Sequence, residues 1–313
     1  MQNDRKSTGR VYKSTGSWYL VRDERGSFRQ ARIKGRFKID DITSTNPVAV
    51  GDLVDMEAED ASETTWIITG IHDRRNYVNR RSPAHRMRHH IVASNLDQSM
   101  LVATLREPRT SQGFIDRFLV ACEAFHIPAI LVFNKADIYR EKDLDTYAEW
   151  EDVYQSAGYK VILASCVTGL GMEELRDALR GRTTLMSGHS GVGKSTLINA
   201  LVPELALRTK EVSGWSGKGM HTTTFAEMHD LPFGGSVIDT PGMREFGLVD
   251  IDERELSHYF PEMRALINGC QFNDCRHLDE PGCAVKKAVE EGRLPVDRYA
   301  SYLVILDGLK EHE

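Results

Sequence analysis

Gly188-His-Ser-Gly-Val-Gly-Lys194-Ser195 fits the spacing Gly-x-x-x-x-Gly-Lys-Ser/Thr at every fixed position. Glycines let the backbone curl until successive N–H groups point inward, where they can hold the oxygens of a phosphate chain. The lysine adds a positive charge for the β- and γ-phosphates, and the serine hydroxyl can ligate Mg²⁺. Residues 182–186 are typical of a strand entering this loop, and residues 195–201 of a helix leaving it. A glycine-rich turn that matches by accident is the alternative, but these flanking elements favour a phosphate-binding loop. Its expected binding residues are Gly188, His189, Ser190, Gly191, Val192, Gly193, Lys194, Ser195 and Thr196, although the sequence assigns His189 no particular role.

Asn134-Lys135-Ala136-Asp137 follows the apolar run 129–133, which is typical of a buried parallel strand. The tetrapeptide resembles the Asn-Lys-x-Asp motif of GTP-binding proteins, whose aspartate accepts hydrogen bonds from N1–H and the amino group of guanine. Adenine presents an acceptor at the first of these positions, so it would leave a buried carboxylate badly paired. A solvated turn at a strand end is the alternative. The motif therefore predicts that Asn134, Lys135 and Asp137 bind guanine.

Three shorter segments complete the predicted nucleotide site. Ser165 and Cys166 follow the apolar run 160–163 and resemble the loop that supports guanine from its other side. Asp239-Thr-Pro-Gly242 resembles the Asp-x-x-Gly motif, whose aspartate holds Mg²⁺ through water and whose glycine N–H senses the γ-phosphate. Residues 217–224, here called the first switch segment, offer Thr222 or Thr223 as a second Mg²⁺ ligand. A plain flexible loop is the alternative for that segment.

The order of these motifs is unusual. In ordinary Ras-like GTPases the phosphate loop comes first, but here the base-reading loops precede it. Such a site is built from loops at the carboxyl edge of one parallel sheet, so their position in space matters more than their order. Permutation is tolerated where the ancestral chain ends lie close together. We therefore expect a circularly permuted α/β P-loop GTPase domain at residues 91–249.

Three of the five cysteines lie within fourteen residues, beside a histidine. Three thiolates and one imidazole form a closed tetrahedral shell that suits a structural zinc ion and leaves no open ligand position for catalysis. A disulfide or unremarkable reduced thiols are the alternatives. The N-terminus lacks the apolar core of a signal peptide, so we expect a cytoplasmic, reducing location that disfavours disulfides. The sequence thus predicts one Zn²⁺ in a mainly α-helical domain at 250–313, held by Cys270, Cys275, His277 and Cys283.

The N-terminal segment has a polarised charge. Residues 1–38 contain eleven lysines or arginines and three acids, whereas 39–65 contain eight acids and no lysine or arginine. The stretches 18–21, 27–33, 52–56 and 65–69 are typical of short strands, and they predict a small β-barrel, best an OB-fold, over residues 1–75. Tyr12, Trp18, Tyr19 and Phe28 lie among the basic residues, as on a nucleic-acid-binding face. Aromatic residues that fill the barrel core are the alternative.

Six arginines and no acid lie between residues 74 and 90, so residues 76–90 are expected to form a basic linker able to lie along nucleic acid. A plain solvated linker is the alternative. The formal net charge of the whole chain is −6, which excludes a uniformly basic protein. No stretch approaches the ~18 apolar residues that span a bilayer, so no membrane partner is expected. Nothing in the sequence demands more than a monomer.

Together, these features resemble the RsgA (YjeQ/YloQ) family of circularly permuted GTPases that depend on the small ribosomal subunit. The resemblance covers almost the whole chain and includes Val50-Gly-Asp-Leu-Val54, Asp73-Arg-Arg-Asn76, Ala93-Ser-Asn-Leu-Asp-Gln98, Gly219-Met-His-Thr-Thr223 and Asp239-Thr-Pro-Gly-Met-Arg-Glu-Phe246. It implies a factor in late maturation of the 30S subunit, with 16S rRNA as partner and GTP hydrolysis stimulated by the subunit. A GTPase switch with a protein partner is the alternative.

The catalytic histidine is expected from the same resemblance. Met243 stands where Ras-like enzymes place a water-orienting glutamine, and a thioether cannot orient an attacking water. In the family this role is suspected for a histidine beside the switch threonines, which here is His221. A solvated loop histidine is the alternative.

Overall fold

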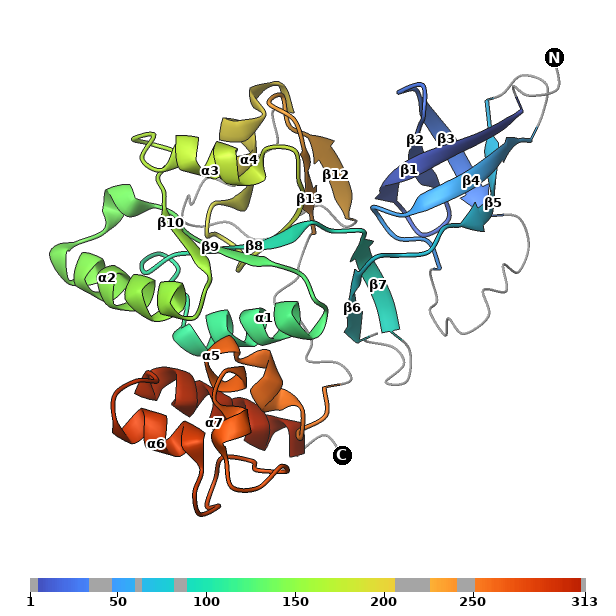
Figure 1. The fold of residues 1–313 in the computed structure, drawn as a ribbon. Helices are drawn as coiled ribbons and strands as arrows, with labels where there is room; N and C mark the ends of the chain where they lie inside the picture. Colours follow the sequence, from blue (N-terminus) through green and yellow to red (C-terminus); the bar gives the residue numbers. More distant parts are fainter. Residues whose placement is uncertain are drawn as a thin grey trace, which may run out of the picture.

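The computed structural model describes residues 5–33, 47–59, 64–81, 89–205, 226–240 and 251–310. Three units are arranged side by side: a small barrel, a central α/β domain and a C-terminal helical unit (Figure 1).

The N-terminal unit is a five-stranded barrel. Its strands are β1 (Lys6–Ser14), β2 (Tyr19–Asp23), β3 (Phe28–Ile33), β4 (Leu53–Ala58) and β5 (Trp66–Ile71). They pair in the order β1-β2-β3-β5-β4, and a further β1–β4 pairing closes the barrel. Alternate residues fill the interior, because successive side chains of a strand point to opposite faces. The buried core comprises Val11, Tyr19, Val21, Ala31, Val48, Val54, Met56, Trp66 and Ile68. The expected OB-type barrel is confirmed.

Strand β1 was not predicted from the sequence, because its burial pattern is irregular and most of its residues are polar. Gly9 fits where β1 crosses β2: a Cβ there would lie 2.6 Å from the carbonyl oxygen of Arg22.

The segment predicted to be a linker contains β6 (Tyr77–Arg81), which pairs antiparallel with β7 (His89–Ser94) as a separate two-stranded sheet. Residues 77–81 are therefore part of a paired β-sheet and not a free linker. Val78 and Ala93, opposite each other in the pairing, are both buried.

The central sheet has the strand order β10-β9-β8-β11-β13-β12. Its strands are β8 (Gln98–Ala103), β9 (Ala129–Phe133), β10 (Lys160–Leu163), β11 (Thr183–Ser187), β12 (Glu227–Asp230) and β13 (Ser236–Asp239). All neighbouring pairs are parallel except β12–β13. The predicted strands at 129–133 and 160–163 match the observed bounds, and the strand predicted at 182–186 is shifted by one residue at each end.

Helices cover both faces of this sheet, as Figure 1 shows. On one side lie α1 (Gln112–Ala124) and α2 (Glu141–Ser156), and on the other α3 (Met172–Leu179) and α4 (Lys194–Leu201). Alternation along the strands divides the core: Leu101 and Leu131 face α1, whereas Met100 and Ile130 belong to the cluster with α3 and α4.

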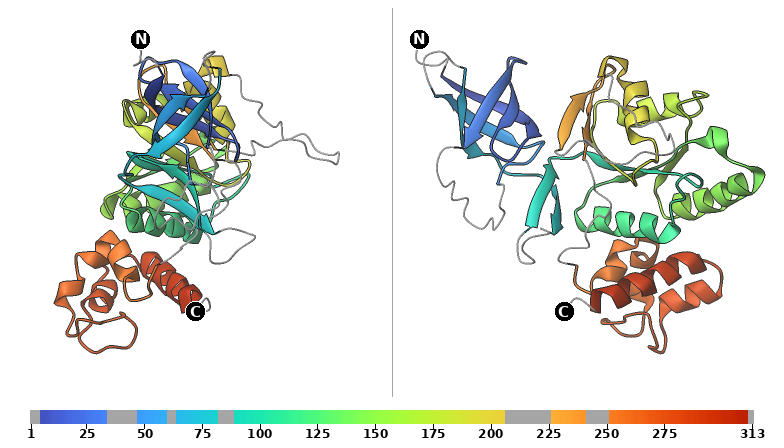
Figure 2. Two further views of the ribbon diagram at one scale, coloured as in Figure 1. Left: turned by 90° about the vertical axis from the view of Figure 1, so that its right-hand side faces the viewer. Right: turned by 180° about the vertical axis from the view of Figure 1, so that it is seen from behind.

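The C-terminal unit consists of short helices: η3 (Leu256–Tyr259), α5 (Pro261–Arg264), η4 (Ile267–Gly269), α6 (Ala284–Glu290) and α7 (Val296–Lys310). It lies against α1, which Figure 2 shows from behind. Phe260, Tyr302 and Leu306 share one buried cluster with α1 residues Phe118 and Leu119. Among the residues that the structure describes, every helix is too short or too polar to cross a bilayer.

Candidate functional site

The predicted phosphate loop joins β11 to α4. Gly188, Gly191 and Gly193 have φ angles of 140°, 87° and 96°, which glycine adopts without strain. A Cβ on Gly188 would lie 2.3 Å from the carbonyl oxygen of Val102, and one on Gly193 would lie 2.5 Å from the side-chain nitrogen of Asn134. The loop therefore requires glycine at both positions.

Lys194 begins α4 and turns back over the loop. Its ammonium donates to the carbonyl oxygens of Gly188 at 2.6 Å and His189 at 2.8 Å. Ser195 is half-buried and Thr196 is exposed in the first turn of α4, and Ser190 is exposed in the loop. The ammonium thus lies over the loop where the phosphate oxygens are expected.

The predicted base-reading loop follows β9. Asn134 is buried at 2% exposure, and Lys135 adopts a left-handed conformation with φ of 63°. The hydroxyl of Ser165 donates to the carboxylate of Asp137 at 2.5 Å, and the Cys166 sulphur lies 4.0 Å from the side-chain oxygen of Asn134. The segments 134–137 and 165–166 therefore form one structural unit, as the sequence predicted.

A direct bond joins this unit to the phosphate loop. The side-chain amide of Asn134 donates to the carbonyl oxygen of Val192 at 3.0 Å, across 58 residues of chain. The loops after β9, β10 and β11 begin at the carboxyl ends of parallel strands in one sheet, and β13 ends at the same edge. Segments far apart in sequence are thus brought to one edge of the sheet.

Asp239 ends β13 at the same edge and is 7% exposed. Burial raises the pKa of Asp239, whereas the nearby Lys194 charge lowers it. Burial lowers the pKa of Lys194, and Asp239 opposes that shift. The Ser195 hydroxyl and the Asp239 carboxylate are oxygen donors, the kind that Mg²⁺ prefers.

Four predicted site residues lie outside the described residues: His221, Thr222, Thr223 and Gly242. Their roles stay predictions from the sequence.

The cysteine–histidine cluster is assembled as predicted. The ligand atoms of Cys270, Cys275, His277 and Cys283 all lie within 4.8 Å of one another. Nδ1 of His277 lies 3.3 Å from the Cys283 sulphur and 3.7 Å from the Cys270 sulphur. Such separations suit a tetrahedral ion with metal–sulphur bonds of about 2.3 Å. The cluster could hold a zinc ion, with four protein ligands and no open position.

Neighbouring groups fix the cluster. The amides of Ala284 and Lys286 each donate to a cysteine sulphur at 3.4 Å, and the Tyr299 hydroxyl donates to the His277 carbonyl at 2.5 Å. His277 adopts φ of 59°, so the loop turns sharply at this ligand. These contacts come from α6 and α7, which explains why helices surround the site.

The four aromatic residues that lie among the basic residues of the N-terminal segment are partly buried in the barrel and partly exposed on its surface. Tyr12 and Tyr19 are buried, at 8% and 1% exposure, whereas Trp18 and Phe28 are exposed, at 42% and 54%. The guanidinium of Arg22 lies 5.9 Å from the Phe28 ring, and that of Arg32 lies 5.9 Å from the Trp18 ring. Two of the four predicted aromatics are thus exposed, each beside an arginine that is itself paired with a carboxylate, Arg22 with Asp230 and Arg32 with Glu59.

Two arginines of the second basic run are committed to the protein itself. Arg74 donates to both carboxylate oxygens of Asp52, at 2.7 and 2.6 Å. Arg75 pairs with Asp97 at 2.7 Å and donates to the Leu96 carbonyl at 2.8 Å. The prediction that the arginines of this run face nucleic acid is therefore wrong for Arg74, whose side chain is 9% exposed. Its bidentate pairing joins the barrel core to the chain that leaves it.

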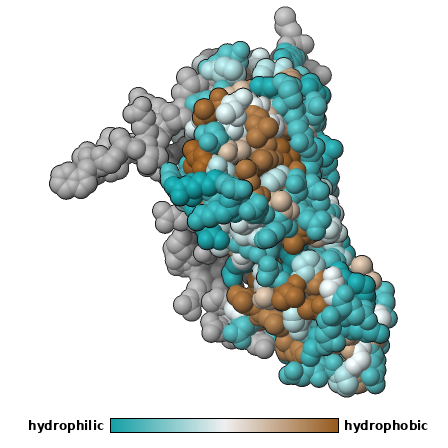
Figure 3. Space-filling view, turned by 90° about the vertical axis from the view of Figure 1, so that its left-hand side faces the viewer, coloured by the Kyte–Doolittle hydropathy of each residue, from teal (hydrophilic) through white to brown (hydrophobic). Residues whose placement is uncertain are grey.

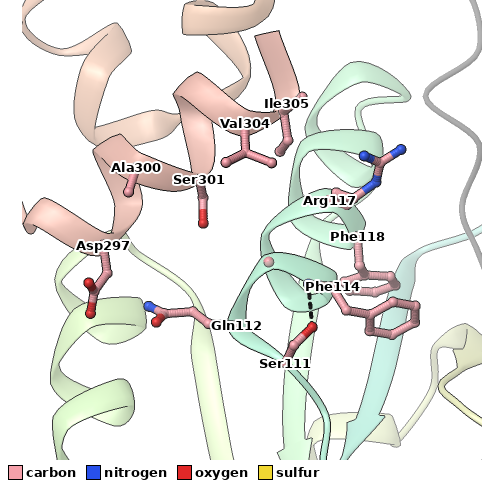
Figure 4. Close-up of a pocket in the computed structure, with 11 residues that line it drawn as sticks. Ser111, Gln112, Phe114, Arg117, Phe118, Asp297, Ala300, Ser301, Val304 and Ile305 are labelled. Carbon is pink, nitrogen blue, oxygen red and sulfur yellow. Dashed lines mark hydrogen bonds between the residues drawn. The ribbon is translucent and has the colours of Figure 1, made fainter. Parts of the chain in front are cut away.

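His189, which the sequence left without a role, stacks on Phe114 of α1 with ring centroids 3.8 Å apart. Phe114 also lines a cavity of about 480 Å³ between α1 and α7, which Figure 4 shows. On the face drawn in Figure 3, apolar surface gathers near the junction of the central and C-terminal units. None of the residues that line this cavity belongs to the loops that carry the predicted nucleotide contacts, although Phe114 touches the phosphate loop through His189. Pairing of the His189 and Phe114 rings depends on tertiary contact, so no sequence signal could have found it.

Comparison with known proteins agrees with this geometry. Residues 71–249 match the RsgA GTPase family, and residues 8–67 match the RsgA N-terminal domain. The chain is 52% identical over 304 residues to the small ribosomal subunit biogenesis GTPase RsgA of Flavobacterium psychrophilum, covering 96% of this chain and 93% of the relative. It is 49% identical over 303 residues to the protein of that name from Bacteroides fragilis, covering 97% of both chains.

Two solved structures are also similar. YjeQ from Thermotoga maritima has a TM-score of 0.78 and 34% identity, covering 97% of this chain and 98% of that one. YloQ, described as a circularly permuted GTPase, has a TM-score of 0.74 and 31% identity, covering 100% of this chain and 98% of that one. The permuted motif order, the joined base and phosphate loops and these matches lead to one conclusion: the chain belongs to the RsgA GTPase family.

Proposed function

We propose that the protein hydrolyses GTP and acts in late maturation of the small ribosomal subunit, with turnover stimulated by that subunit. The observation that carries the nucleotide part is the Asn134–Val192 bond, which places the base-reading loop against the phosphate loop. The names of the relatives supply the ribosomal part and favour it over a protein partner.

In this proposal, Asp137 accepts the N1–H and amino protons of guanine, while the Ser165 hydroxyl holds its carboxylate in place. Lys135 lies beside the base, and Cys166 supports it from the other side. Lys194 exchanges the Gly188 and His189 carbonyls for the β- and γ-phosphate oxygens, and the loop amides surround the phosphates.

Ser195 and one threonine of the first switch segment, Thr222 or Thr223, would ligate Mg²⁺, with Asp239 behind them. When bound there, Mg²⁺ would neutralise charge that develops on the phosphate oxygens. The Gly242 N–H contacts the γ-phosphate, and His221 orients the attacking water, because Met243 cannot. Replacing His221 with alanine should lower stimulated turnover and leave GTP affinity nearly intact. A large loss of affinity would instead make it a binding residue.

We propose that one Zn²⁺ is held by the cysteine–histidine cluster in a structural role. With four protein ligands the ion has no free position for a reactive water, so it organises the C-terminal unit instead.

The barrel would contact 16S rRNA through its exposed surface. Phe28 and Trp18 offer rings on which bases stack. The guanidinium groups of Arg22 and Arg32 lie beside these rings, but they are paired with Asp230 and Glu59, so the exposed rings are the main contact proposed here. Binding through phosphate contacts weakens steeply as salt rises, so co-sedimentation with small subunits should be lost between about 50 and 200 mM salt. Replacing Phe28 with alanine should weaken co-sedimentation, and an unchanged profile would place the RNA contact elsewhere.

The organisation of the chain follows from the same proposal. We propose a monomer, with the OB-fold domain at residues 1–75, a basic connection at 76–90, the GTPase domain at 91–249 and the zinc-binding domain at 250–313. Because ribosomal subunits are assembled in the cytoplasm, we also place the protein there.

The decisive experiment measures phosphate release from GTP by the purified protein, with and without small ribosomal subunits. Turnover by the protein alone should be slow. Met243 occupies the position where Ras-like enzymes have a catalytic glutamine, and the sequence identifies no arginine as an arginine finger. Small subunits should accelerate it, and large subunits, as the matched control, should not. Equal rates under the three conditions would overturn the proposal.

A further inference from the structure

The barrel is attached to the central domain at one particular strand. Strand β12 lies in sequence between the first switch segment and Asp239, and β1 of the barrel pairs with it. Lys13 of β1 is the partner of Glu227 in this antiparallel pairing. The two sheets therefore join into one of 11 strands, which Figure 1 shows where the blue barrel approaches β12.

A row of charged residues crosses this junction. Glu227 is the partner not only of Lys13 but also, on its other side, of Asp239 in β13. Residues directly opposite each other in neighbouring strands share one face of the sheet, with Cβ atoms about 5 Å apart. Lys13, Glu227 and Asp239 thus lie side by side on three consecutive strands. The Lys13 ammonium lies 2.8 Å from the Glu227 carboxylate.

Glu227 and Asp239 place two carboxylates opposite each other in this row, and without Lys13 the charge of Glu227 would be unpaired there. Like charges in that position repel, and here one of them belongs to the predicted Mg²⁺ and phosphate site. The barrel lysine supplies the charge that offsets Glu227.

Other contacts hold the barrel in place independently of this pair. The Tyr12 hydroxyl donates to Asp230 at 2.8 Å, and Arg22 pairs with the same carboxylate. Arg10 donates to the Thr183 hydroxyl at 3.3 Å. Removing the Lys13 ammonium therefore changes the charge of the row without removing the rest of the interface.

We propose that Lys13 is a positioning residue of the nucleotide site: by pairing with Glu227, it cancels the negative charge opposite Asp239 and so favours binding of the triphosphate. The inference rests on the role proposed above for Asp239. Under this proposal the barrel contributes to the GTP site through Lys13, which is 214 positions away from Glu227 in sequence.

The test compares equilibrium binding of fluorescent GTP and GDP analogues, with Mg²⁺, to full-length variants at low salt. In Lys13→Met the unpaired Glu227 repels the phosphates, so the Kd for the triphosphate should rise about fivefold and that for the diphosphate about twofold. The triphosphate suffers more because it carries an additional negative charge. In Lys13→Met/Glu227→Gln the repelling charge is gone, and both Kd values should return to within about twofold of the unmodified protein.

The matched control is Lys6→Met, which removes another lysine of β1 whose partner, Glu57, belongs to the barrel itself. It should leave both Kd values unchanged. The inference is overturned if Lys13→Met binds both nucleotides normally. It is also overturned if the double variant stays as weak as Lys13→Met, because then the lysine acts only by fastening the barrel. The variant Asp239→Asn distinguishes a failure of the role inferred for Lys13 from a failure of the role proposed for Asp239. If it weakens Mg²⁺-dependent binding while Lys13→Met does not, only this inference fails. If it binds normally, the role proposed for Asp239 fails as well.

Discussion

The contact between the C-terminal unit and the central domain rests on a buried ion pair. Arg298 of α7 and Asp116 of α1 are both 0% exposed, and the guanidinium donates to the carboxylate at 2.5 Å. Arg298 also donates to Glu262 at 2.6 Å, and the Tyr154 hydroxyl donates to Asp116 at 2.9 Å. Replacing Arg298 with methionine would leave Asp116 buried without its countercharge.

We expect Arg298→Met to cost about 3–5 kcal/mol of stability, the range found when one partner of a buried pair is removed. Burial already raises the pKa of Asp116, against the lowering effect of Arg298. Without the arginine this carboxyl would take up a proton, which places the cost toward the lower end of that range. With an unfolding entropy of about 2.1 cal/mol/K per residue, a loss of about 3 kcal/mol lowers the melting temperature by about 5 °C if the chain unfolds as one unit.

Thermal unfolding followed by circular dichroism measures this change. Arg264→Met is the matched control, since Arg264 pairs with Glu123 across the same interface but its side chain is 50% exposed. That exposed pair should contribute less than about 1 kcal/mol. The double variant Arg298→Met/Asp116→Leu removes the fully buried pair but leaves Glu262, whose side chain is 13% exposed, without its partner, so it should recover only part of the lost stability. The reasoning is refuted if Arg298→Met melts no lower than Arg264→Met, or if the double variant stays as unstable as the single one.

Three further predictions follow from the sites described above. Asp137→Asn replaces the acceptor of the two guanine protons by an amide, so affinity for GTP should fall at least a thousandfold and affinity for xanthosine triphosphate should rise; competition binding checks this, and unchanged guanine preference would contradict it. Metal analysis should find one zinc per chain, lost in Cys283→Ser, and chelation should lower the melting temperature; a metal-free protein of equal stability would disprove the structural role. Burial raises the pKa of Asp97, but the Thr183 amide and Arg75 lower it more, so the net shift is downward. The stability that Asp97 contributes should therefore be complete above its unfolded pKa of about 4 and be lost as pH falls through the lower folded value. The destabilisation caused by Asp97→Asn should then be largest at pH 7 and should shrink as pH falls below about 4, and a loss that does not change with pH would show that charge is not the cause.

The convergence of the predicted nucleotide loops could be foreseen because their motifs are local, whereas their contacts to the nucleotide stay predictions. Each lies directly after a buried apolar strand, and parallel strands bring their carboxyl ends to one edge. The Asn134–Val192 bond then follows from the fold. The cysteine–histidine cluster could also be predicted from the sequence, because its four residues lie within fourteen positions of one another.

The contacts between domains could not be predicted, because they join residues distant in sequence without a repeating pattern. Lys13 and Glu227 are 214 positions apart, and Asp116 and Arg298 are 182 apart. The exposure of the barrel aromatics was also undetermined. Trp18 lies just before β2 and stays exposed, whereas its neighbour Tyr19 begins the strand and points into the core.

The central claim is that loops from separate parts of the chain form one pocket that prefers guanosine triphosphate. Calorimetric titration of the full-length protein with GTP and, separately, with ATP tests it most directly. The account predicts one site per chain for GTP, with an affinity at least a thousandfold higher than for ATP, because adenine leaves the Asp137 carboxylate without its donors. Equal affinity for the two nucleotides would contradict it.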